Sequence, residues 1–202
     1  MNPLPTDQAL VSAQQAEHLV GRVLVRLVDA LAAQRHLLNL GQSCRDPTVL
    51  IAQGLRLLIR SHDIEQCSVF IPEEGQLRCS VGTGVSERPG RHLPVAFPMG
   101  EGLMGVAALE RHVVWVPDTR QDPRFLAAPQ RLNSPGPRTL VCVPLLAEQR
   151  LLGVLNVSHS DPAAFAAWQA QAFALFGQLL AHLLDYHDLR VNGAPGHHRR
   201  FS

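Results

Sequence analysis

Three glycines with the spacing G-x-G-x-x-G form the pattern in this sequence that most directly suggests chemistry. They are Gly100, Gly102 and Gly105. In dinucleotide-binding proteins, glycines at this spacing form a loop between a strand and a helix, and the loop binds the diphosphate. Asp118 follows at about the distance expected for the acidic residue that binds the ribose. However, the helix expected after these glycines is short, and the other strands are expected in hairpins. The sequence therefore favours a tight turn in which glycine permits close approach of the chain.

The four cysteines are the second group with chemical potential. They are Cys44, Cys67, Cys79 and Cys142, and their spacing contains neither a C-x-x-C pair nor a zinc-finger pattern. This spacing predicts reduced thiols in a cytoplasmic protein. Cys142 lies between two valines in an expected buried strand, whereas a reactive thiol needs a polarising, partly open environment. We therefore expect structural cysteines rather than a redox centre.

Polar and aromatic residues around the glycine motif are candidate contacts for a small ligand. Asp118, Arg124 and Arg138 carry charges that suit contact with an anion. The alternative is structural, with aspartate side chains bonding loop amides and Arg124 pairing locally. Phe70 and Trp115 are candidate pocket walls, and core packing is the alternative for both. The candidate ligand-binding residues are Phe70, Cys79, Trp115, Asp118, Arg124, Phe125, Arg138 and Cys142.

The composition indicates one globular domain with extensions. The chain has 202 residues, of which 46% are hydrophobic and 17% are charged. A formal net charge of +1 argues against a nucleic-acid partner, which would need a basic face. Charged or polar residues interrupt the longest apolar stretches, and no signal peptide is evident, so we expect no membrane contact.

A long helix is expected over residues 8–40, because one face repeats apolar residues at heptad spacing. The face comprises Val20, Leu24, Leu27, Leu31 and Leu38. A helix of ~33 residues is ~50 Å long, which exceeds the width of a compact domain. We therefore expect it to pack partly on its own domain and partly on a second copy, giving a homodimer.

The remaining sequence alternates hairpins with helices. Asp46 or Thr48 caps a helix over residues 48–61, and Ser160 or Asp161 caps a final helix that begins at Pro162. Between them we expect hairpins over 67–81 and 138–159, a short strand over 93–97, a helix over 103–111, a strand over 113–116 and a long loop over 119–137.

Turn chemistry sets the register of the two hairpins. A turn at Glu74-Gly75 places Phe70 opposite Cys79, and strand alternation then puts Cys67 on the other face. A turn centred on residues 148–149 pairs Cys142 with Leu155 and, next to them, Val143 with Val154. Both faces of the second hairpin are apolar, so we expect central strands that are covered on both sides.

An ordered set of short motifs resembles the GAF domain family. The motifs are GEGL at 100–103, VPD at 116–118, DPRF at 122–125, RTLVCVPL at 138–145, GVLN at 153–156 and Phe165. The resemblance implies an α+β fold with an antiparallel sheet of five or six strands, helices on one face and a pocket on the other. Residues 93–137 would cover that pocket. We expect a helical extension over 1–47, the GAF domain over 48–188 and a disordered tail over 189–202.

The sequence lacks the motifs by which GAF domains bind their known cofactors. Cyclic-nucleotide GAF domains carry an Asn-Lys-Phe-Asp-Glu set, of which only Phe165 agrees here. Bilin-binding relatives attach through a cysteine usually followed by histidine, and no cysteine here has that neighbour. None of the ten histidines is marked out as a haem ligand. The cofactor is therefore unknown, and the ligand is an unidentified small molecule.

The resemblance implies a sensory or regulatory domain without enzymatic activity, which signals through its terminal helices in a homodimer to a partner protein. Two alternatives remain open. One is an enzyme of the same fold that reduces free methionine sulfoxide with Cys142 or Cys79. The other is an interaction module whose pocket is filled by its own side chains.

Overall fold

The computed structural model describes residues 7–84, 96–125 and 136–192, and its six strands form one antiparallel sheet in the order β3-β2-β1-β6-β5-β4. The strands are β1 Gln66–Glu73, β2 Gln76–Gly84, β3 Ala96–Pro98, β4 Val114–Val116, β5 Thr139–Ala147 and β6 Arg150–His159. The helices are α1 Asp7–Ser43, α2 Pro47–Ser61, α3 Gly102–Glu110 and α4 Ala167–Asn192, with a short 3-10 helix η1 at Thr119–Gln121. This arrangement confirms the α+β class and the predicted strand number.

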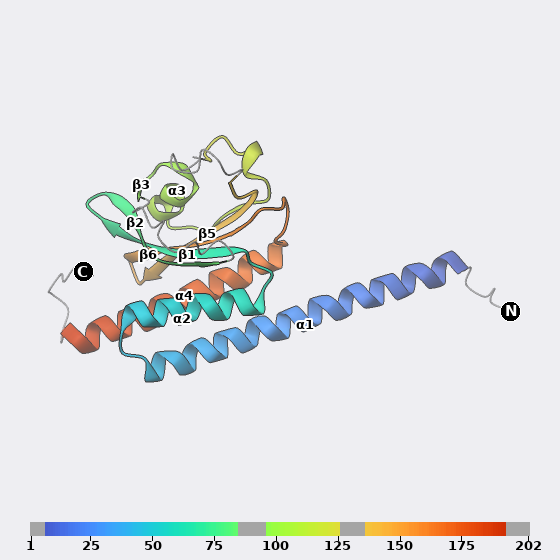
Figure 1. The fold of residues 1–202 in the computed structure, drawn as a ribbon, viewed down its shortest axis with the longest axis horizontal. Helices are drawn as coiled ribbons and strands as arrows, with labels where there is room; N and C mark the ends of the chain where they lie inside the picture. The colour runs from blue at the N-terminus through green and yellow to red at the C-terminus, as the bar shows by residue number, and fades with distance from the viewer. Residues whose placement is uncertain (1–6, 85–95, 126–135, 193–202) are drawn as a thin grey trace.

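The sheet is covered on both faces (Figure 1). Helices α2 and α4 contact one face, which we call the helix face, and α1 packs outside them against both. The central residues of the helix face include Val69, Val141 and Leu155. Helix α3 lies on the opposite face, the α3 face, which includes Phe70 and Cys142. The two-sided burial predicted for β5 follows from this layering.

Helix α2 begins where the sequence predicts, because Asp46 caps it. Its Oδ1 atom accepts hydrogen bonds from the backbone amides of Thr48 at 2.8 Å and Val49 at 3.3 Å. Pro47 occupies the first helical position, where the missing N–H costs nothing.

Helix α4 begins at Ala167, five residues later than predicted. Residues 161–164 are instead tied to the sheet. The hydroxyl of Thr139 donates to Asp161 O at 2.6 Å and accepts from Ala164 N at 3.1 Å. The amide of Ala163, which has a φ of 53°, donates to Pro117 O at 2.7 Å. These bonds compete with the first helical turn, so the helix forms only after them.

The C-terminal boundary also differs from the prediction. Helix α4 continues to Asn192, so residues 189–192 are helical rather than part of a disordered tail. The rest of the predicted tail, 193–202, lies outside the described residues, as do residues 93–95 of the short strand.

The register of the first hairpin is as predicted, and that of the second is not. Phe70 pairs with Cys79. Cys142 pairs with Asn156 rather than Leu155, because the register shifts between Leu145 and Leu146. The extra residue is Leu152, since Leu145 pairs with Gly153 and Leu146 with Leu151. As a result, Leu155 lies on the helix face and Val154 on the α3 face, the reverse of the prediction.

Helix α1 has one buried face and one exposed apolar face. Ala30, Ala33 and Leu37 are buried against the domain. The predicted heptad face is exposed, by 57% at Leu24 and 66% at Leu31. The N-terminal half of the helix extends beyond the body of the domain (Figure 1).

Candidate functional site

The glycine motif forms a tight turn that starts α3. Gly100 and Gly102 have φ values of 84° and 65°, which favour glycine. The amide of Gly100 donates to Gly105 O at 3.0 Å. A Cβ atom at Gly105 would lie 2.4 Å from Pro98 O and 2.9 Å from Gly100 N. The glycines therefore serve close backbone packing, as the sequence favoured over a dinucleotide site.

Two of the candidate residues lie together on the α3 face. Phe70 and Cys142 are buried in an apolar cluster with Leu103 and Met104 of α3. The ring of Phe70 stacks edge-to-face on Phe97, with the ring centroids 5.7 Å apart. These side chains belong to one buried apolar cluster on the α3 face of the sheet.

The other apolar candidates are dispersed. Phe125 is half-buried against the same cluster, and Cys79 is exposed on β2 opposite Phe70. Trp115 pairs with Val141, so strand alternation directs it to the helix face, where it is 37% exposed. Trp115 therefore does not share a face with Phe70 and Cys142.

Asp118 and Arg138 form a bidentate ion pair at the edge of the sheet. Arg138 Nε donates to Asp118 Oδ1 at 2.9 Å, and Nη2 donates to Oδ2 at 2.6 Å. The carboxylate also accepts from Arg120 N at 3.1 Å. These hydrogen bonds from Arg138, more than the charge alone, lower the pKa of Asp118 to about 2. The pair joins the end of β4 to the start of β5.

Arg124 pairs locally with Asp122. Its Nε and Nη2 atoms donate to the two carboxylate oxygens at 3.0 and 2.7 Å, and its backbone amide donates to Oδ1 at 2.9 Å. The hydrogen bonds from Arg124 lower the pKa of Asp122. In this geometry the guanidinium groups of Arg124 and Arg138 both face carboxylates, so an anion would have to compete with those partners.

A family model for the GAF domain matches residues 15–184, which is most of the chain. The chain belongs to the GAF domain family. The match begins within α1, so it includes part of the segment that was expected to be an extension. No curated protein matches the chain at a significant level.

Several solved structures share this GAF fold. The GAF domain of a phosphoenolpyruvate-protein phosphotransferase from Coxiella burnetii has a TM-score of 0.70 and 18% identity, covering 82% of this chain and 97% of that one. A free methionine-R-sulfoxide reductase from Neisseria meningitidis has a TM-score of 0.69 and 17% identity, covering 80% and 91%. A protein from Burkholderia vietnamiensis described as a GAF sensor has a TM-score of 0.65 and 20% identity, covering 80% and 94%.

Three thiols of this GAF domain, those of Cys67, Cys79 and Cys142, sit in environments that disfavour the thiolate. All four cysteines are free. Burial raises the pKa of Cys67 to about 12, and it also raises the pKa values of Cys142 and Cys79. Cys142 Sγ lies 3.7 Å from Asn156 Oδ1, which is a weak hydrogen bond and supplies no positive charge.

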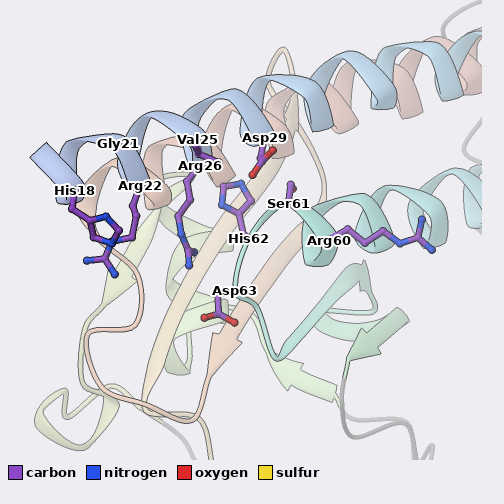
Figure 2. A pocket seen from close by; sticks show the side chains of 10 residues that line it. All are labelled: His18, Gly21, Arg22, Val25, Arg26, Asp29, Arg60, Ser61, His62 and Asp63. Carbon is purple, nitrogen blue, oxygen red and sulfur yellow. The ribbon is translucent and has the colours of Figure 1, made fainter.

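Sequence reasoning missed a groove between α1 and the end of α2, which we call the α1–α2 groove (Figure 2). It is lined by His18, Gly21, Arg22, Val25, Arg26, Asp29, Arg60, Ser61, His62 and Asp63. The available signal was the recurrence of His18, Arg22 and Arg26 at every fourth residue of a predicted helix. The residues of α2 that complete the groove required the fold.

Within residues 7–84, 96–125 and 136–192, no group of three or more His, Cys, Asp or Glu side chains is arranged to hold a metal ion. Over the same described ranges, no helix combines the length and apolar character needed to cross a membrane.

The Asp118–Arg138 pair predicts a pH dependence of stability. The pKa of Asp118 is 3.8 ordinarily and about 2 in the folded domain, so the unfolded chain binds more protons between these values. Stability from this group is therefore complete above about pH 4 and is lost as the pH falls towards about 2. Urea unfolding between pH 2 and 5 should show a shallower pH dependence for Asp118→Asn than for the wild-type protein. Identical slopes would contradict the assignment.

Proposed function

We propose that this GAF domain is a non-enzymatic sensory or regulatory module that binds a small ligand beneath residues 93–137 and signals through α1 and α4. The observation that carries the proposal is α1. One face of this helix is part of the core, at Ala30, Ala33 and Leu37, while its heptad face is exposed. Exposed apolar surface of this kind favours association, so we propose a homodimer formed through α1.

The C-terminal part of α4 contacts both the end of α1 and the sheet. His187 Nε2 of α4 is 2.9 Å from Gly41 O of α1. Arg150, at the β5–β6 turn, forms ion pairs with Asp185 at 2.5 Å and Asp188 at 3.2 Å. A ligand that favours one arrangement of the sheet would therefore shift the packing of α4 against α1, provided that it binds the two arrangements with different affinity.

The ligand site rests on the α3 face. Phe70, Cys142 and Phe125 would supply its apolar wall, while Asp118 and Arg138 border the same segment of the chain. A partner protein would bind one arrangement of the dimer in preference to the other. Four free cysteines suit a reducing compartment, so we propose a cytoplasmic location.

A thermal-shift screen tests the ligand proposal. We expect at least one compound among cyclic nucleotides, haem, bilins, amino acids, methionine sulfoxide and small anions to raise the melting temperature. A ligand present at 100 times its Kd stabilises by about 2.7 kcal/mol, which shifts the melting temperature by several degrees. Binding should weaken in Phe70→Ala and persist in Leu109→Ala, a matched change at an exposed position of α3. No shift with any compound would favour the interaction-module alternative.

The second candidate function is reduction of free methionine sulfoxide, which the likeness to the reductase structures favours. The raised pKa values of Cys142 and Cys79 argue against it, because the thiolate is the nucleophile. We expect no reductase activity above background in the wild-type protein. Activity that disappears in Cys142→Ser or Cys79→Ser would overturn the non-enzymatic proposal and identify the reactive thiol.

A further inference from the structure

In the α1–α2 groove, the guanidinium groups of Arg22 and Arg26 form no ion pair with an acidic side chain among the described residues. His18, Arg22 and Arg26 lie at every fourth position of α1 and project along one side of it (Figure 2). Arg26 is only half-exposed. Arg138, by contrast, has a carboxylate within 3 Å. A guanidinium group presents a planar fork of donors that suits an oxyanion.

A buried histidine forms the inner wall of the groove. His62 is 6% exposed, and its Nδ1 atom has no hydrogen-bond partner among the described residues. The ring is held by two aromatic side chains of α4, with centroids 4.9 Å from Phe173 and 6.3 Å from Trp168. A buried polar atom without a partner is uncommon in folded proteins and calls for an explanation. A ligand in the groove, which His62 lines, would supply one.

The acidic residues of the groove, Asp29 and Asp63, form no direct ion pair with Arg22 or Arg26 in the described structure. Burial and the charge of Arg26 lower the pKa of His62 to about 4, with Asp29 acting in the opposite direction. His62 is therefore neutral at pH 7 and offers one donor and one acceptor.

We propose that the α1–α2 groove binds the phosphate group of a small molecule, through the guanidinium groups of Arg22 and Arg26 and the imidazole of His62. The groove has a volume of about 1030 Å³, which accommodates a phosphorylated metabolite. Gly21 adds open space, because a Cβ atom there would meet nothing within 4 Å. Arg60 extends away from His62 along α2, so it borders the site rather than completing it (Figure 2).

An occupied groove would connect α1 to the start of β1 through the ligand. Arg22 and Arg26 belong to α1, whereas His62 follows α2 directly. The site is separate from the proposed ligand site on the α3 face, because it lies on the helix side of the sheet and shares no residue with that site.

Calorimetric titration with orthophosphate and pyrophosphate, at constant ionic strength and pH 7, tests this proposal. We expect saturable binding by the full chain and at least tenfold weaker binding by Arg26→Gln, which loses a forked, charge-assisted contact. Arg35→Gln is the matched control, because it removes the same charge from an exposed position of α1 outside the groove. Equal affinities of the two variants, or no binding by the wild-type protein, would overturn the proposal.

Two further measurements sharpen the result. Bound phosphate should raise the pKa of His62, followed by NMR, because a nearby negative charge favours the imidazolium form. An unchanged pKa would contradict contact with His62. Adenosine monophosphate should bind more tightly than a phosphoserine peptide, and the reverse order would contradict the assignment to a small molecule.

Discussion

Replacing Gly105 with alanine is expected to lower the free energy of unfolding by about 3 kcal/mol. The added Cβ atom would lie 2.4 Å from Pro98 O and 2.9 Å from Gly100 N. Both are backbone atoms of the turn that starts α3, so a side-chain rotation cannot relieve the overlap. The turn would have to move, and with it the packing of α3, through Leu103, against Phe70. Urea unfolding followed by circular dichroism measures the loss.

Gly21→Ala is the control for this change. Gly21 is exposed on α1, and a Cβ atom there meets nothing within 4 Å. Because alanine has the higher helix propensity, this variant should be more stable by up to about 1 kcal/mol. The two glycine substitutions should therefore have opposite signs. A stable Gly105→Ala variant would mean that the glycine is not required for packing and would reopen a binding role for the motif.

Introducing aspartate at both Leu24 and Leu31 is expected to convert the proposed dimer into monomers. These side chains are 57% and 66% exposed and lie on the heptad face of α1. Removing four leucines from a two-chain interface costs about 6 kcal/mol at about 1.5 kcal/mol each. That cost corresponds to roughly four powers of ten in Kd. Light scattering should report twice the chain mass for the wild-type protein and 22.1 kDa for the variant.

Leu109→Asp separates loss of the interface from a general effect of surface aspartate. Leu109 is 64% exposed, but it lies on α3, on the far side of the sheet from α1. This variant should keep the mass of the wild-type protein. A wild-type protein that is already monomeric at micromolar concentration, or an equal response of both variants, would refute dimerisation through α1.

The elements that the sequence predicted well have local causes. The cap of α2 at Asp46 and the turn at Glu74-Gly75 depend on residues within a few positions of one another. The strands of the β5–β6 hairpin were also predicted, but their register was wrong by one residue. Both faces of this hairpin are apolar, so a one-residue slip exposes no polar side chain, and the bulge at Leu152 leaves no pattern in the sequence.

The start of α4 shows a different limit. The Asp161-Pro162 pair is a strong local signal for a helix start. However, the hydroxyl of Thr139, more than 20 positions away in sequence, forms hydrogen bonds with the backbone of residues 161 and 164. Long-range contacts of this kind override local propensity.

In the candidate site too, contacts between neighbouring residues were predictable, whereas contacts between distant segments were not. Local pairing of Arg124 was one of two interpretations of the sequence, and its partner Asp122 proves to be only two positions away. The pairing of Asp118 with Arg138 spans 20 residues and needs β4 to lie beside β5. The groove at His62 could not be assembled from one segment, because α1 and α2 supply its two walls.

The length of α1 has a mechanical consequence. Among its described side chains, Ala30 is the first that is buried, and the helix begins at Asp7. The part before Ala30 is therefore a lever roughly 35 Å long, at 1.5 Å per residue. A tilt of about 5° where the helix leaves the domain would displace its tip by about 3 Å, comparable to half a helical turn. Movements too small to alter the sheet visibly would still change which residues meet at the far end of the helix.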